Sequence, residues 1–78
     1  STGINDKLII RAPMPGKIVE VPVHEGSEIK SGEPVIVLEA MKMQNEILSS
    51  VNGVVARIGV KPGQNVMKDD ILAEVTVK

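Results

Sequence analysis

The feature that most limits the fold of this chain is a weak internal repeat with an offset of 37 residues. At this offset Gly16 falls on Gly53, and Gly26 falls on Gly63. Apolar positions follow the same offset: Ile18 matches Val55, Val21 matches Ile58, Val23 matches Val60, Ile29 matches Val66 and Val35 matches Leu72. Few matched residues are identical, so the agreement lies in turn glycines and apolar positions. Two similar halves packed face to face can share one core that neither half could bury alone.

The apolar runs between the turn residues have the character of short β-strands. Val and Ile together number 21, against four Leu and four Ala, and β-branched side chains suit a pleated, half-buried surface better than a helix. Glycine and proline recur at short intervals and leave no room for a helix. The expected strands are Lys7–Arg11, Lys17–Val23, Glu28–Lys30, Pro34–Ala40, Met43–Leu48, Val54–Val60, Asn65–Met67 and Ile71–Val77. Short strands with frequent turn residues predict an all-β sandwich or barrel.

The length of 78 residues allows one small domain. We expect residues 7–78 to form this domain and residues 1–6 to be the end of a linker, because the start has neither an initiator methionine nor the features of a signal peptide. Under the repeat, the turn at Ala40–Met43 joins the two halves. The two chain ends are therefore expected to meet at the opposite end of the molecule.

Composition argues against several classes of function. The chain has no cysteine, so it can form neither a disulfide nor a thiolate zinc site, which fits a reducing compartment. Nine basic and ten acidic residues are spread along the chain, and no aromatic residue is present to stack on bases, so nucleic-acid binding is not expected. The apolar runs of four or five residues are too short for direct membrane insertion. His24 is the only histidine, which argues against a metal site.

The segment Glu39–Met43 breaks a local rule that the rest of the chain obeys. The chain must reverse between the strands Pro34–Ala40 and Met43–Leu48, yet it has no Gly, Asn-Gly or Asp-Gly there. Tight two-residue hairpins favour those residues because they need φ > 0. The other turns have ordinary formers: Glu25-Gly26, Asn52-Gly53, Pro62-Gly63 and Asp69-Asp70. Local rules tend to be broken at functional sites, so this turn is the candidate site.

Lys42 lies at the tip of this turn. It is one of seven lysines, and a lysine is usually a solvated surface charge. The turn and the repeat boundary coincide here, which predicts an amine that is held out of the core and exposed. Met41 and Met43 flank it and are expected to serve recognition rather than core packing, because flexible thioether side chains adapt to several surfaces.

Four other side chains receive plainer interpretations. Met14 and Met67 lack this context and are expected to contribute to core or turn packing. Glu39 and Glu46 lie near the hairpin, but nothing in the sequence supports acid–base chemistry for them. They are expected to solvate exposed strand positions, with Glu39 also read by a partner.

The motif Ala40-Met41-Lys42-Met43 resembles the attachment motif of the biotinyl domain, the carrier of biotin-dependent carboxylases, decarboxylases and transcarboxylases. The resemblance covers nearly the whole chain: Ala12–Gly16 resembles the opening strand and turn of the family, and Glu25 through Gly32 its central turn. It implies a flattened barrel of two four-stranded antiparallel sheets with a pseudo-two-fold repeat, the barrel-sandwich hybrid. It also implies biotin joined by an amide to Lys42, with Glu39, Ala40, Met41 and Met43 read by the ligase or by partners.

The resemblance implies a carrier domain without catalytic activity of its own. Biotin protein ligase attaches biotin to Lys42, and the biotin shuttles an activated carboxyl group between the biotin carboxylase and carboxyltransferase domains or subunits of a multi-component enzyme. The expected location is the cytoplasm, or the mitochondrial matrix in a eukaryote. The run Lys17–Val23 continues directly into His24-Glu25-Gly26, with no room for the protruding thumb of bacterial acetyl-CoA carboxylase carriers, so a thumbless carrier is expected.

Two alternatives share the fold. A lipoyl carrier domain of a 2-oxo acid dehydrogenase complex has a similar lysine hairpin, but its usual neighbours are Asp before and Ala after the lysine, so Met41 and Met43 oppose it. An unmodified scaffold domain, as in membrane-fusion proteins, needs no lysine at the tip.

Overall fold

The computed structural model describes residues 6–78, and this part of the chain forms eight β-strands and no helix. Residues 1–5 of the expected linker lie outside the described residues. The strands are β1 Lys7–Arg11, β2 Gly16–Glu20, β3 Glu28–Ile29, β4 Pro34–Ala40, β5 Met43–Leu48, β6 Gly53–Ile58, β7 Asn65–Val66 and β8 Ile71–Val77. Every predicted strand is present, and the bounds of four of them agree fully with the prediction. The sequence therefore specifies the strand pattern closely, as expected from its turn residues.

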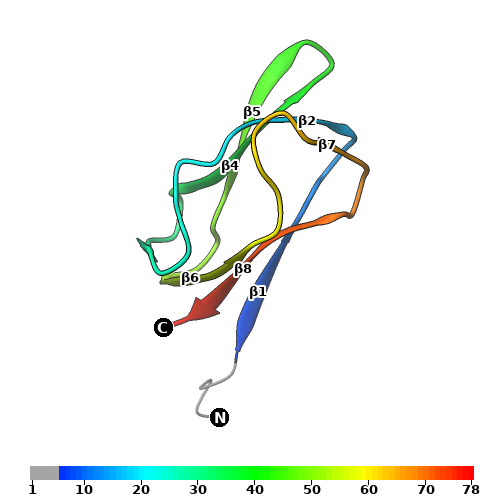
Figure 1. The fold of residues 1–78 in the computed structure, drawn as a ribbon. Helices are drawn as coiled ribbons and strands as arrows, with labels where there is room; N and C mark the ends of the chain where they lie inside the picture. Colours follow the sequence, from blue (N-terminus) through cyan, green and yellow to red (C-terminus); the bar gives the residue numbers. More distant parts are fainter. Residues whose placement is uncertain (1–5) are drawn as a thin grey trace.

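The strands form two four-stranded sheets that enclose the core (Figure 1). One sheet has the order β1-β8-β6-β3 and the other β5-β4-β2-β7, and all their pairings are antiparallel. Each sheet takes two strands from each half of the chain, because the offset of 37 residues relates β1 to β5, β2 to β6, β3 to β7 and β4 to β8. The predicted fold class, a flattened barrel or sandwich with an internal pseudo-two-fold repeat, is confirmed.

The repeat extends to individual hydrogen bonds. Gly26 N–H donates to the carbonyl of Val55 at 2.8 Å, and Gly63 N–H donates to the carbonyl of Ile18 at 2.8 Å. The offset of 37 residues relates Gly26 to Gly63 and Ile18 to Val55, so the two bonds are equivalent. Each joins a turn of one half to a strand of the other half. The two halves are thus held together by equivalent backbone contacts as well as by the shared core.

The glycines Gly16 and Gly53 are required by a close approach of strands. A Cβ added at Gly16 would collide with the carbonyl oxygen of Glu39, and one at Gly53 with that of Thr76. The expectation of a turn at Asn52-Gly53 is wrong, because Gly53 is buried and opens β6, while the bend lies at residues 50–51. The side chain of Asn52 instead accepts a hydrogen bond from Ser31 N–H at 2.9 Å.

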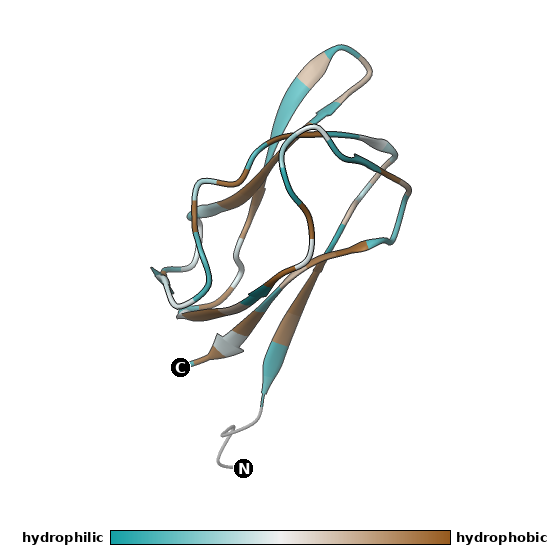
Figure 2. Cartoon of the chain, in the orientation of Figure 1, coloured by the Kyte–Doolittle hydropathy of each residue, from teal (hydrophilic) through white to brown (hydrophobic). Residues whose placement is uncertain are grey.

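The core is aliphatic and lies between the two sheets. Ile18, Ile36, Leu38, Leu72 and Val75 are completely buried. Figure 2 shows this apolar character along the strands of the body, whereas the projecting β4–β5 hairpin has both hydrophilic and pale apolar segments up to its tip. Ser49, the polar residue in the buried set, donates a hydrogen bond from Oγ to the carbonyl of Val51 at 2.7 Å. No ionisable group lies in the core of the described residues.

The β4–β5 hairpin and the chain ends lie at opposite ends of an elongated molecule. The principal extents are 41 × 20 × 18 Å, and Figure 1 shows the hairpin projecting at the top with the end of β8 and the start of β1 at the bottom. Val77 N–H donates to the carbonyl of Asp6 at 3.0 Å, which holds the first and last described segments side by side. The expected separation of turn and chain ends is confirmed.

The segment from Val21 to Ser27 joins β2 directly to β3. It contains no protruding insertion, so the thumbless form expected from the sequence is confirmed.

Candidate functional site

The candidate site is the tip of the β4–β5 hairpin, which extends beyond the body of the barrel (Figure 1). Ala40 pairs with Met43, so the reversal is made by Met41 and Lys42 alone. Their φ angles are +53° and +66°. Two successive positive φ angles are the signature of a type I′ turn, in which Asn and Gly are the preferred residues. The unusual composition of this turn therefore has a structural counterpart in backbone strain.

The register of the hairpin forces this conformation. Pairing of Glu39 with Gln44 and of Leu38 with Asn45 continues without a break up to Ala40 and Met43, and leaves two residues for the turn. Leu38 is fully buried and Ala40 is only 5% exposed, so core packing fixes β4 in this register. A left-handed conformation costs a residue with a side chain about 1–2 kcal/mol, and here the cross-strand ladder and the buried base of the hairpin offset that cost.

Lys42 is exposed at this tip. Within residues 6–78, no hydrogen bond or ion pair engages its Nζ atom, whereas Lys7 Nζ lies 3.6 Å from Glu74 and Lys78 Nζ lies 2.6 Å from Glu28. Its amine is thus presented at the outer end of a fixed hairpin, as the sequence predicts.

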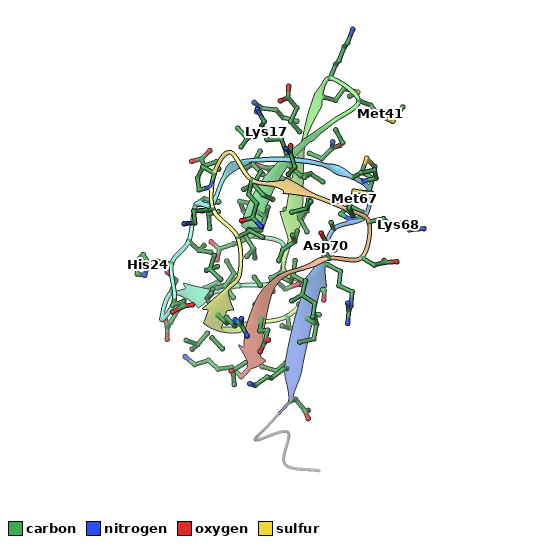
Figure 3. All side chains as sticks on the ribbon, turned by 45° about the vertical axis from the view of Figure 1, so that its right-hand side comes forward. Lys17, His24, Met41, Met67, Lys68 and Asp70 are labelled. Carbon is green, nitrogen blue, oxygen red and sulfur yellow. The ribbon has the colours of Figure 1, made fainter. Side chains whose placement is uncertain are left out.

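Met41 and Met43 are exposed beside it, at 88% and 67% of their surface. Figure 3 shows Met41 at the hairpin tip, away from the core. The expectation that they do not pack in the core is confirmed. Met14 packs partly against the core, as expected. Met67 does not: it lies in the turn after β7 and is 66% exposed, because its backbone rather than its side chain serves the turn, donating to Asp70 Oδ2 at 2.8 Å.

Glu39 faces solvent on the outer surface of its sheet, in one row with Gln44 on β5 and Lys17 on β2. Sequence reasoning did not single out Lys17, which is brought to the foot of the hairpin by the pairing of β2 with β4 (Figure 3). Glu46 is opposite Val37 in the next row of this sheet. Ala40 is buried directly beside the two-residue turn and offers little surface to a partner.

Further functional features to consider in the described residues are a metal site, a functional histidine and a membrane-spanning helix. No group of three His, Cys, Asp or Glu side chains is placed to hold a metal ion there. His24 lies at the surface on the β2–β3 connection, with its Nδ1 3.1 Å from the carbonyl oxygen of Glu25 (Figure 3). None of the described segments is a helix long and apolar enough to cross a membrane.

A hollow of about 470 Å³ lies away from the hairpin, lined by Glu28, Lys30, Glu33, Asn52 and Lys78 among others. Lys78 hydrogen-bonds to Glu28 here at 2.6 Å and lowers the pKa of that carboxyl. The hollow includes the last residue of the chain, so it belongs to the end of the molecule opposite Lys42.

The chain is similar in sequence to biotin carriers and to biotin-dependent carboxylases. The sequence model of the Biotin_lipoyl family, described as "Biotin-requiring enzyme", matches residues 9–75. A biotin carboxyl carrier protein of Streptococcus mutans is 44% identical over 64 residues, covering 82% of this chain and 49% of the relative. Pyruvate carboxylase of Aspergillus terreus is 40% identical over 73 residues, or 94% of this chain. The chain spans only 6% of the length of that relative.

Solved structures with the same fold are parts of large carboxylases. A single-chain, multi-domain long-chain acyl-CoA carboxylase matches 92% of this chain with a TM-score of 0.87 at 36% identity, over 7% of its own length. Urea carboxylase of Kluyveromyces lactis matches 91% of this chain with a TM-score of 0.86 at 25% identity, over 6% of its length. These relatives do not favour the lipoyl alternative. The chain belongs to the Biotin_lipoyl family of biotin-requiring enzymes, as a biotinyl domain with the role of a biotin carrier.

Proposed function

We propose that biotin is attached through an amide to Nζ of Lys42. The observation that carries this proposal is the two-residue turn in which both residues have positive φ, because it places this one lysine at the far end of a fixed hairpin. Amide formation needs an exposed primary amine, and Lys42 offers one at the tip. The exposed thioethers of Met41 and Met43 give a ligase an apolar surface on both sides of that amine.

The attached biotin supplies a ureido nitrogen that carries a carboxyl group between two active sites. The protein contributes a fixed point of attachment: the strand β4 behind Lys42 is held by the core, while the lysine side chain is exposed at the tip. Tethering keeps the carried group at a high effective concentration near neighbouring sites. The proposed partners are a biotin protein ligase, a biotin carboxylase and a carboxyltransferase, as domains or subunits of one multi-component enzyme.

We infer that this chain does none of the chemistry itself. Its short match to the length of a pyruvate carboxylase supports a part of a larger enzyme. The substrate of that enzyme is left open, because relatives include pyruvate, propionyl-CoA and acyl-CoA carboxylases. The cytoplasm or the mitochondrial matrix is the proposed location, and one relative is a mitochondrial pyruvate carboxylase of Homo sapiens.

The test is to incubate the chain with a biotin ligase, ATP and biotin, and to locate the added mass by peptide mapping. We expect one biotin, on Lys42, and none in the Lys42→Arg variant, which keeps the positive charge without a comparable nucleophile. Lys68→Arg is the matched control, because Lys68 is also exposed in a turn between strands. Biotin on another lysine of Lys42→Arg, to a similar extent, would refute the assignment.

A further inference from the structure

We propose that Met41 and Met43 form a reversible oxidation site that controls whether Lys42 can be acylated, an inference that rests on the proposed attachment of biotin there. Hydroperoxides are the chemical class of oxidant. Oxidation would convert the two apolar side chains beside the lysine into polar sulfoxides without disturbing the barrel.

The first support is the scarcity of other oxidisable groups. The chain contains no Cys, Trp or Tyr and only four Met. Thioethers are therefore the main targets for a mild oxidant in this chain, and two of the four lie within one residue of Lys42.

The second support is exposure. Met41 is 88% exposed and Met43 is 67% exposed. Oxidation follows access of the oxidant to sulfur, so both react readily. Met14 is partly buried against the core and is expected to react more slowly. Met67 is 66% exposed, nearly as much as Met43, but it belongs to the turn between β7 and β8 (Figure 3). Met67 is therefore an internal control: a methionine nearly as exposed to the oxidant as Met43 but not adjacent to Lys42.

The chemistry balances with hydrogen peroxide as oxidant. A sulfur lone pair attacks one peroxide oxygen, the S–O bond forms as the O–O bond breaks, and the departing hydroxide takes up the remaining proton as water. The thioether sulfur is oxidised by two electrons and the peroxide is reduced by two. Methionine sulfoxide reductases reverse the change.

The structure separates the effect on recognition from any effect on folding. Met41 and Met43 contribute little to the core, and the pairing of Ala40 with Met43 depends on backbone groups that the sulfoxide does not alter. A sulfoxide oxygen accepts strong hydrogen bonds and must be desolvated where a thioether packed without cost. The barrel should remain folded while a ligase loses the apolar surface around the amine.

The test begins with the untreated chain and with the chain treated with hydrogen peroxide, after removal of the peroxide by catalase. Peptide mapping measures sulfoxide at each methionine, and intact mass measures the initial rate of biotinylation by a ligase that has not met the oxidant. We expect sulfoxide at Met41, Met43 and Met67 before Met14. We expect the rate to fall about tenfold, the factor that corresponds to 1.4 kcal/mol, and to recover after treatment with methionine sulfoxide reductases.

Two variants assign the effect. In the double variant Met41→Leu and Met43→Leu, the tip stays apolar but cannot be oxidised, so peroxide should leave its own rate unchanged. The Met67→Leu variant should remain as sensitive as the parent chain. Sulfoxide at both tip residues with an unchanged rate would overturn the proposal, and so would equal loss of rate in the double Leu variant. Absence of biotinylation in the untreated chain would instead show that the proposed attachment at Lys42 is wrong.

Discussion

Replacing Lys42 by glycine should stabilise the fold, although it removes the proposed attachment site. Lys42 has φ +66°, and a residue with a side chain pays about 1–2 kcal/mol to adopt this conformation. Glycine avoids that cost but loses more chain entropy on folding, about 0.5–1 kcal/mol. Taken between the middles of the two ranges, the difference predicts a net gain of about 0.75 kcal/mol for Lys42→Gly. For a domain of this size, that corresponds to a rise in Tm of roughly 3–6 °C.

A matched substitution isolates the strain. Lys68 is also exposed in a turn, and it is not among the residues with positive φ. Lys68→Gly therefore carries the entropy cost without relief of strain and should lose about 0.5–1 kcal/mol. The two variants should differ by about 1–2 kcal/mol, which is the strain itself because the entropy terms cancel. Thermal unfolding followed by circular dichroism measures both. Equal Tm values for the two variants would refute the argument that the hairpin tip is strained.

Two further predictions concern stability and charge. Changing Met41 and Met43 together to Ala should leave the Tm nearly unchanged, whereas Leu38→Ala, in the core, should cost about 2–5 kcal/mol; a large drop in Tm for the Met variant would show that those side chains are packed after all. Lys78→Ala should raise the pKa of Glu28 toward its ordinary value in an NMR titration, because the hydrogen bond and charge of Lys78 lower it. A carboxyl whose pKa is lowered in the folded state stabilises the fold above its ordinary pKa, and this stabilisation is lost as the pH falls through the pKa of the folded state. Any stabilisation from the Lys78–Glu28 pair should therefore disappear at acid pH. A pKa of Glu28 that does not respond to Lys78→Ala would contradict the contact.

The strands could be predicted because their causes are local. Turn glycines and β-branched runs mark them, and the strained turn at Met41–Lys42 follows from a reversal with no turn-forming residue. β2 ends at Glu20, earlier than the predicted Val23. Pro22, which has no N–H to donate to a ladder, already indicated an edge or a bend there, but the bulge between Ile18 and Glu20 in the pairing with β4 could not be predicted. Val21 and Val23 continue the apolar pattern and pack on the core, but as part of the connection and not of the ladder.

The features that were missed depend on contacts between distant segments. Gly53 was expected to form a turn because Asn-Gly usually does, and only the carbonyl of Thr76 on the neighbouring strand shows why glycine is needed there. Lys17 reaches the foot of the hairpin through pairing with a strand about twenty residues away in the chain. The candidate lysine itself could be predicted because its signal, a turn of the wrong composition, lies entirely within five residues.

The sharing of both sheets by the two halves has a consequence for how the chain folds as it is made. In one sheet β1 must wait for β8 and β3 for β6, and in the other β2 must wait for β7, so neither sheet can be completed while the second half is still inside the ribosome. The chain loses entropy when it closes such long loops, and this loss comes before the hydrogen bonds of strand pairing can offset it. Folding is therefore slow compared with that of a fold built from local contacts. The hairpin of β4 and β5 is the longest pair of sequential strands and can form early. A modifying enzyme that reads only this tip could then meet its target before the barrel has closed, whereas one that also reads the surrounding sheet would act only on the finished domain.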